Sequence, residues 1–235
     1  MADASLFHCK LLGSMMKSPK ELLSPNRDAF AADPIGYSAL AWHKWGMAQT
    51  IAGFSVDITK APTPDDLKSP VLWLTQAHAM AEAARVVLEN EPNLSHLSVF
   101  TKGVCDCQYC AVGLMLVGYS LEICLKAMLI MRKGIASYTA DEPAHKHHRL
   151  VELAEFIPEL SAKDRAILQA LTHFVLWAGR YPDPGSRRLE NAEEVFSLAE
   201  QHEITAKQLF ELAGRVMGHS QHVVETHSAK GASGS

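Results

Sequence analysis

The feature that most constrains this chain is an apolar run from Val112 to Met131, inside a longer helical stretch that we place at Val104–Lys133. The run carries only two charges, Glu122 and Lys126, and apolar or small side chains occupy nearly every face of a helix drawn at ~100° per residue. Such a helix is either the centre of a bundle or a membrane span. We expect the centre of a bundle, because each charge would cost a lipid-facing helix ~2.5–3.5 kcal/mol. Inside a bundle, an acid four residues before a base can form a pair.

The composition is that of an ordinary globular chain. Its 235 residues are enough to bury a proper core in one large domain. A net charge of −4 argues against a nucleic-acid footprint over the whole surface but permits a local basic patch. The N-terminus lacks the basic segment and clean apolar run of a signal peptide, and an odd number of cysteines argues against a disulfide framework. We therefore expect a cytoplasmic protein.

Helical spacing of apolar residues recurs along the chain and no convincing alternating run appears, so the sequence predicts an all-α protein. Ser69 and Ser161 are the expected N-caps of two helices. Gly134 is the expected end of the central helix, and Gly179 that of the helix that Ser161 begins. The helices predicted besides the central one cover residues 38–54, 69–90, 149–157, 162–178 and about 189–217.

The expected architecture is an up-and-down helical bundle around one long central helix, with an irregular N-terminal extension. Residues 1–68 are expected to form that extension, with one helix, packed on the bundle. Residues 69–219 form the bundle itself. The small, polar residues at 220–235 predict a flexible tail.

A group of three cysteines allows two interpretations. Cys105, Cys107 and Cys110 could ligate a metal if a fourth ligand such as His145 came from elsewhere. They could equally be small apolar residues of a buried helix, the usual place of free cysteine. Cys124 cannot complete the site, because fourteen helical residues separate it from Cys110 by ~21 Å. We expect neither a metal nor a cofactor.

Polar residues near the central helix are the other candidates. His148 stands just before the apolar side of a short helix, where we expect it to cap that helix or to point back at the core. Arg180, Arg187 and Arg188 form the one local basic cluster, which is either solvated surface or a site for phosphate or carboxylate. No Gly-x-Ser-x-Gly elbow and no phosphate-binding glycine loop occur in the chain.

Three segments, taken in order, resemble elements of the HEPN-type domains. Leu-Glu-x-x-Leu-Lys-Ala ends at Ala127, His-x-Leu-x-x-Leu begins at His148, and Arg-Tyr-Pro begins at Arg180. The likeness covers about residues 70–217 and depends on the order and spacing of the motifs. It implies a helical bundle that commonly dimerises. Many members are metal-independent ribonucleases of toxin–antitoxin, phage-defence or RNA-processing systems.

The sequence departs from the catalytic members of that family. They carry an arginine followed, after four to six residues, by a histidine at the start of the last helix, whereas the residues after Arg180 include no such histidine. Arg215 and His222 have the spacing, but they lie at the far end of the last helix, and one match is expected by chance. The residues that carry over are the polar set Glu122, Lys126, His148 and Arg180. Tyr119 and Tyr181 are further candidates for the same polar site.

Two hypotheses of different classes follow. In the first, the protein acts in RNA-linked defence or stress, either as an atypical, metal-independent ribonuclease or as a non-catalytic RNA binder. Arg180 and Lys126 would hold phosphate, and His148 would be the general acid or base. In the second, it is a non-enzymatic dimerising module whose buried polar groups fix the packing. A metal-binding protein built on the three cysteines is a third. The expected partners are a second copy of the chain, RNA and an antitoxin-like protein, with no membrane.

Overall fold

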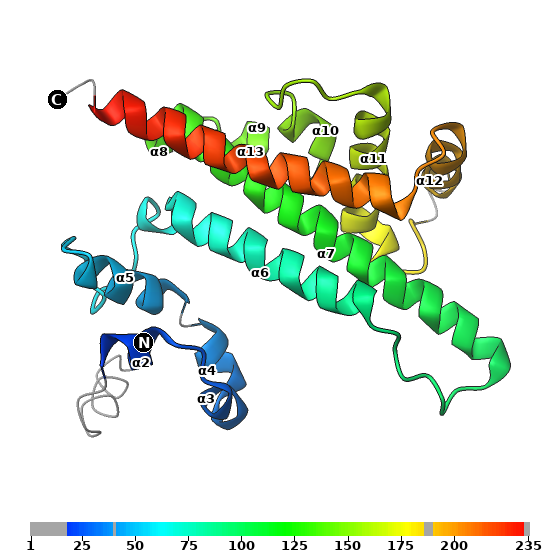
Figure 1. Cartoon of the computed structure of the whole chain (residues 1–235), viewed down its shortest axis with the longest axis horizontal. Helices are drawn as coiled ribbons and strands as arrows, with labels where there is room; N and C mark the ends of the chain where they lie inside the picture. The colour runs from blue at the N-terminus through cyan, green and yellow to red at the C-terminus, as the bar shows by residue number, and fades with distance from the viewer. Residues whose placement is uncertain (1–17, 40, 186–189, 233–235) are drawn as a thin grey trace. The chain divides into compact units, whose positions relative to one another are not determined.

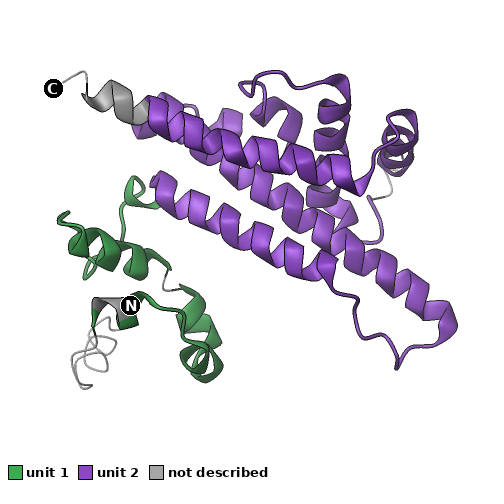
Figure 2. Cartoon of the chain, viewed as in Figure 1, with its two compact units in different colours: residues 1–67 green, residues 68–235 purple. Residues whose placement is uncertain are grey.

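The computed structural model describes residues 18–39, 41–185 and 190–232 of the chain. Arg187 and Arg188 lie outside these ranges. Over the described residues every regular element is a helix, which confirms the all-α prediction (Figure 1). The chain divides into two compact units, Met1–Leu67 and Lys68–Ser235 (Figure 2).

The first unit contains more helix than the sequence predicted. One helix was expected at 38–54, whereas the unit holds α2 (Pro19–Leu23), α3 (Arg27–Ala32), α4 (Pro34–Ala39) and α5 (Ala41–Ile51). Helices of five or six residues are too short to show a periodic pattern. Trp42 and Trp45 of α5 stack with their ring centroids 4.9 Å apart, and Trp42 is the most buried large side chain among the described residues of this unit.

The second unit is built around helix α7 (Val99–Lys133), as predicted. The helix begins five residues before the expected start and ends at Gly134, whose φ of 77° only glycine adopts readily. Its middle and C-terminal parts are buried, and Leu121, Leu125 and Met128 are fully enclosed. The central position of the apolar run is therefore confirmed.

Three further helical segments cover α7. Helix α6 (Pro70–Glu89) runs antiparallel to it and has the predicted ends, with Ser69 as N-cap, although the serine side chain makes no capping bond. Helix α11 (Ala162–His173) begins with the predicted capping box of Ser161 and Asp164. Helix α13 (Ala206–Ala232) lies along α7 and runs in the same direction (Figure 1).

Short elements connect these helices. They are η1 (Asp66–Lys68), α8 (Ile135–Ala140), α9 (Glu142–His145), α10 (Leu150–Leu153), the π-helical turn η2 (Phe174–Ala178) and α12 (Glu190–Gln201). The single helix predicted at 162–178 is thus α11 followed directly by η2. Such wide turns occur often at functional sites.

The prediction of one last helix at about 189–217 is wrong. Glu203, with a φ of 47°, lies between α12 and α13, and α13 begins three residues later. Helix α13 then continues to Ala232, through most of the segment for which a flexible tail was predicted. Val216 and Val223 explain the longer helix, because both are buried and they continue its apolar stripe almost two turns past the predicted end.

Candidate functional site

A buried carboxylate lies at the centre of the polar cluster. Glu122 of α7 is only 5% exposed, and its Oε1 accepts a hydrogen bond from Nζ of Lys126 at 2.7 Å. Its other oxygen, Oε2, lies 2.8 Å from Nδ1 of His148. An ionised carboxylate only accepts hydrogen bonds, so Nδ1–H of His148 is the donor. Both oxygens of this buried acid are therefore bound, as burial of a charge requires.

The backbone around α10 directs His148 at α7. The N–H group of Leu150, the first residue of α10, donates to the hydroxyl of Thr172 on α11 at 3.1 Å. The fully buried side chain of Leu150 also packs in the core and so holds the start of α10 in place. The N-cap of α10 is Arg149, and its side chain forms no cap. Of the two expectations for His148, pointing back at the core is confirmed and capping is wrong.

The pairing leaves one nitrogen of His148 available. In the neutral ring, a proton on Nδ1 that is donated to Glu122 leaves the lone pair on Nε2. The side chain is 42% exposed, and across the described part of the chain Nε2 has no hydrogen-bond partner. A histidine held in one tautomer by a carboxylate, with its second nitrogen open to solvent, has the arrangement of a general base.

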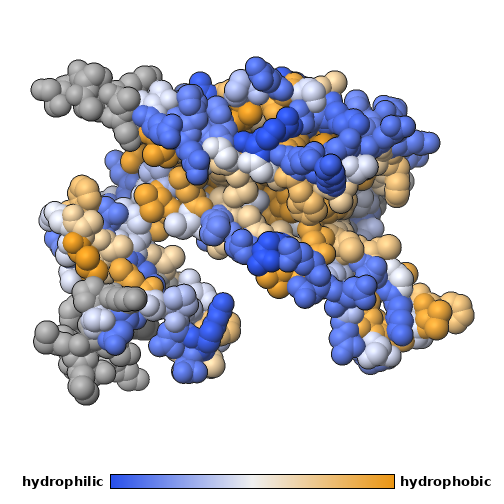
Figure 3. Space-filling model, viewed as in Figure 1, coloured by the Kyte–Doolittle hydropathy of each residue, from blue (hydrophilic) through white to orange (hydrophobic). Residues whose placement is uncertain are grey.

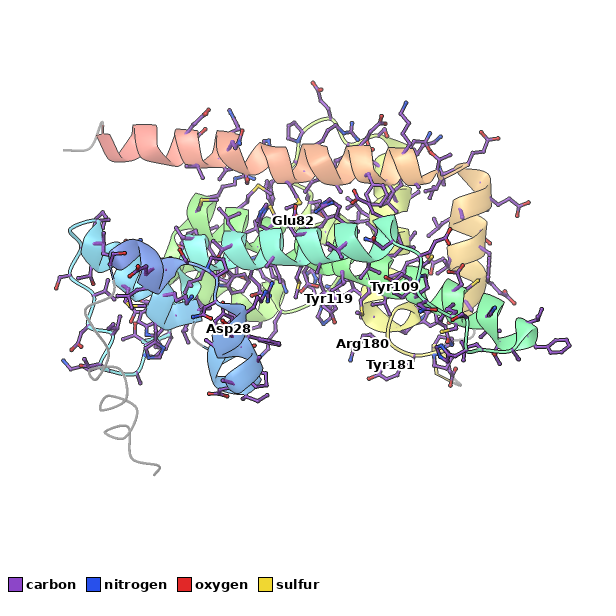
Figure 4. All side chains as sticks on the ribbon, turned by 60° about the horizontal axis from the view of Figure 1, so that its bottom comes forward. Asp28, Glu82, Tyr109, Tyr119, Arg180 and Tyr181 are labelled. Atoms are coloured by element: carbon purple, nitrogen blue, oxygen red, sulfur yellow. The ribbon has the colours of Figure 1, made fainter. Side chains whose placement is uncertain are left out.

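Tyr119, one turn before Glu122, links His148 to Arg180. The rings of Tyr119 and His148 meet edge to face, with centroids 6.2 Å apart. Arg180 donates to the hydroxyl of Tyr181 at 3.3 Å, and this bond, followed by the nearby Tyr119, raises the pKa of the guanidinium. Arg180 and Tyr181 lie on the loop after η2, next to Tyr119 of α7 (Figure 4). Tyr119 thus has both His148 and the exposed guanidinium of Arg180 as neighbours.

Two glycines allow η2 to lie directly on α7 and so place Arg180. A Cβ atom on Gly118 would be 2.5 Å from Cγ2 of Val175, and one on Gly179 would be 2.3 Å from Cβ of Met115. Either contact is shorter than real Cβ atoms show. This approach fixes Arg180 at the level of Tyr119.

The structure corrects two expectations about the cations. Arg180 was expected in one polar set with Glu122, but its side chain neighbours Tyr119, one turn before Glu122 on α7, and Tyr181. Lys126 was expected to help Arg180 hold phosphate. Its ammonium group is buried and bound to Glu122, so it supports the carboxylate, and Arg180 is the cation left facing solvent.

The site also includes a tyrosine that the sequence did not single out. Tyr138 of α8 is buried, and its burial, followed by Glu142 and Glu122, raises its pKa to about 12. Its ring stacks on His145, which accepts a hydrogen bond from Lys133 at 2.9 Å. Burial and Lys133 lower the pKa of His145, which keeps this ring neutral. Aromatic spacing alone could not identify Tyr138, because none of the predicted helices covers its segment.

The three clustered cysteines do not lie in the core. Cys105 is half-buried, and Cys107 and Cys110 are exposed, so their interpretation as buried core residues is wrong. The first turns of α7 extend past the helices that cover its middle, which explains the exposure. Cys124 is buried, and burial raises its pKa to about 11. Among the described residues, no three His, Cys, Asp or Glu side chains form a group that could hold a metal.

Comparison of the chain with known protein families, with curated proteins and with solved structures finds no match in any of the three. One described helix, α7, is long and apolar enough to cross a membrane. Its most apolar 18 residues are 61% buried within the unit, as the core helix of a soluble protein would be.

Proposed function

We propose that the protein binds RNA and cleaves it without a metal ion, with His148 as the general base and Arg180 as the phosphate-binding group. The observation that carries this proposal is the Glu122–His148 pair. It leaves Nε2 of the part-exposed His148 without a partner among the described residues, and Tyr119, whose ring contacts His148, also neighbours the exposed guanidinium of Arg180. The resemblance to HEPN domains adds the context of RNA-linked defence or stress, with an antitoxin-like protein as partner.

The reaction needs only groups that this site, RNA and water supply. Nε2 of His148 removes the proton of a 2′-hydroxyl, and the 2′ oxygen attacks the adjacent phosphorus. A new bond from the 2′ oxygen to phosphorus forms while the bond to the 5′ oxygen breaks, and that oxygen takes a proton from water. The products are a 2′,3′-cyclic phosphate and a free 5′-hydroxyl. Arg180 stabilises the negative charge on the phosphate oxygens.

The test is incubation of the purified protein with total RNA and with tRNA, in the presence and absence of EDTA. We expect cleavage that survives EDTA, leaves cyclic phosphate ends and is lost in His148→Ala. His147→Ala is the matched control, because His147 lies in the same loop but faces Glu152, 3.6 Å away. Cleavage that needs a metal, or that persists in His148→Ala, would reject the proposed chemistry.

A second candidate function, a non-enzymatic dimerising module, is favoured by a different observation. Apolar side chains are exposed on the first turns of α7, where Phe100 is 92% exposed, and orange atoms gather at that end of the helix (Figure 3). Val86 of α6 and Phe210 of α13 are also exposed. In such a module the pair of Glu122 and His148 would serve only to fix the packing. Dimer formation with no RNA cleavage would favour this candidate.

A further inference from the structure

A second cluster of basic and aromatic side chains lines a pocket away from His148. The pocket has a volume of about 460 Å³ and lies where the end of α7, the segment after α10 and helix α13 meet. Arg132 comes from α7, Phe156 from the segment after α10, and His219, His222 and Thr226 from α13. Among the described residues, no aspartate or glutamate lines it.

The two histidines face each other across less than one helical turn. The ring centroids of His219 and His222 are 5.4 Å apart, and the His219 ring also lies 6.3 Å from that of Phe156. The guanidinium carbon of Arg132 is 4.5 Å from the centre of the Phe156 ring. These contacts hold three nitrogen-bearing side chains around one space.

The groups of this pocket lack a counter-charge. Within the described part of the chain, Arg132 makes no ion pair, and neither histidine ring is hydrogen-bonded to another side chain. Burial, then His222, then Arg132 lower the pKa of His219, and no acid lining the described pocket opposes them. The segment after α10 lines the pocket with Phe156 and Pro158, neither of which is charged. A bound anion would supply the missing negative charge and reverse this effect.

The geometry points to a binding site for the phosphate group of a nucleotide-sized ligand. Arg132 and the protonated forms of His219 and His222 donate to the phosphate oxygens. The rings of Phe156 and His219 form an aromatic wall against which a base can stack. A divalent cation suits the pocket poorly, because the described lining offers no carboxylate and places a fixed positive charge beside the histidines. This site is separate from His148 and does not depend on the proposed RNA cleavage.

The ligand class is tested by NMR of the histidine ring protons in the whole chain. Inorganic phosphate, adenosine monophosphate and adenosine are added in turn at a pH just below neutrality. We expect phosphate and the nucleotide to shift the His219 and His222 signals and to raise the pKa of His219, with tighter binding of the nucleotide. Adenosine alone should leave them nearly unchanged. A short RNA with a terminal phosphate, compared with the same RNA without it, distinguishes an RNA end from a free nucleotide.

Three substitutions locate the binding groups. Arg132→Gln, His219→Gln and His222→Gln should each weaken nucleotide binding by about tenfold or more, the effect of losing one hydrogen bond to a charged group. Arg132→Lys, which keeps the charge, should retain part of the affinity. His78→Gln, at an exposed position of α6, is the matched control and should bind as the wild type does. Thermal melts establish that each variant is folded.

Binding should also weaken as the pH rises, because the histidines then lose the protons that they donate. The proposal is overturned if phosphate and nucleotide leave both histidine signals unmoved at millimolar concentration. It is equally overturned if folded Arg132→Gln binds them as tightly as His78→Gln does.

Discussion

Nδ1 of His148 lies 2.8 Å from Oε2 of Glu122, although the two residues stand 26 positions apart in the chain. The bond joins the short connection before α10 to the middle of α7. The carboxylate is buried and also bound by Lys126, so the histidine is one of two donors that compensate the burial of one charge. The same bond sets the orientation on which the proposed chemistry depends.

Removing the carboxylate should destabilise the fold strongly. Glu122→Ala leaves the buried ammonium of Lys126 unpaired and should lower the free energy of unfolding by ~3–5 kcal/mol. Glu122→Gln keeps the shape and one acceptor and should cost less. Urea melts of the two variants make the comparison. Glu82→Ala, which removes an exposed acid of α6 paired with Arg85, should cost under ~1 kcal/mol. A loss within ~0.5 kcal/mol for Glu122→Ala would mean that the polar centre is not a structural element.

Gly118 should tolerate no side chain, whereas another glycine of α7 should. Gly118→Ala places a methyl group against Val175 and should cost ~1–3 kcal/mol by overpacking. It should also shift η2 and weaken RNA binding at Arg180 while the Glu122–His148 pair stays intact. A Cβ atom added to Gly103 would meet no other described atom within 4 Å, so Gly103→Ala should stabilise α7 by ~0.5–1 kcal/mol. Equal melting midpoints for the two alanine variants would contradict this account of the helix contact.

Asp164 should make stability depend on acid pH. Burial raises its pKa, but hydrogen bonds from Ser161 and the charge of Arg215 outweigh burial, so the pKa lies below its usual 3.8 in the folded chain. Its contribution is therefore complete above pH 3.8 and is lost as the pH falls through the lower, folded value. Asp164→Asn should cost ~1–3 kcal/mol near neutral pH.

Urea melts of wild type and Asp164→Asn across this pH range check the sign of that dependence. The difference between the two proteins should shrink below pH 3.8. Arg215→Gln, which removes only the ion pair between α11 and α13, should show part of the effect. A difference that grows as the pH falls would contradict the lowered pKa.

The exposed start of α7 should make the protein a homodimer. Phe100 and Val104 are 92% and 59% exposed, and burying such side chains between two copies stabilises an assembly by ~1.5–3 kcal/mol for each large residue. Light scattering at micromolar concentration should give twice the mass of the chain. Phe100→Ser should shift the protein toward monomer, whereas Phe196→Ser, at an exposed position of α12, should not. A monomeric wild type would remove the prediction.

The sequence was sufficient to predict the helix ends that follow a long apolar pattern or carry a specific capping signal. The ends of α6, the stop of α7 at Gly134 and the capping box at Ser161 are of this kind. The short helices of the first unit have too few residues for a period to show. The break at Glu203 depends on one left-handed residue that is not glycine, which no simple propensity signals.

Only those residues of the candidate site that belong to the sequence motifs could be predicted. The motifs brought Glu122, Lys126 and His148 together, and the structure places them in contact. The position of Arg180 depends on glycine contacts between α7 and η2, which spacing along the chain does not reveal. The pocket of Arg132, Phe156 and His219 was missed because its three sides come from segments far apart in the sequence. The α13 side of the pocket was missed for a second reason: the helix was predicted to end near residue 217, before His219 and His222.

The uneven burial of α7 gives one continuous helix two different lifetimes for its backbone hydrogen bonds. All residues from 99 to 104 are exposed, whereas nearly all from 117 to 131 are enclosed by other helices. Amide hydrogens in the first turns can exchange with solvent when a few residues fray, which costs little free energy. Those at the centre must wait until the whole unit opens. A second copy of the chain bound at the start of α7 would remove this gradient and slow exchange along the entire helix.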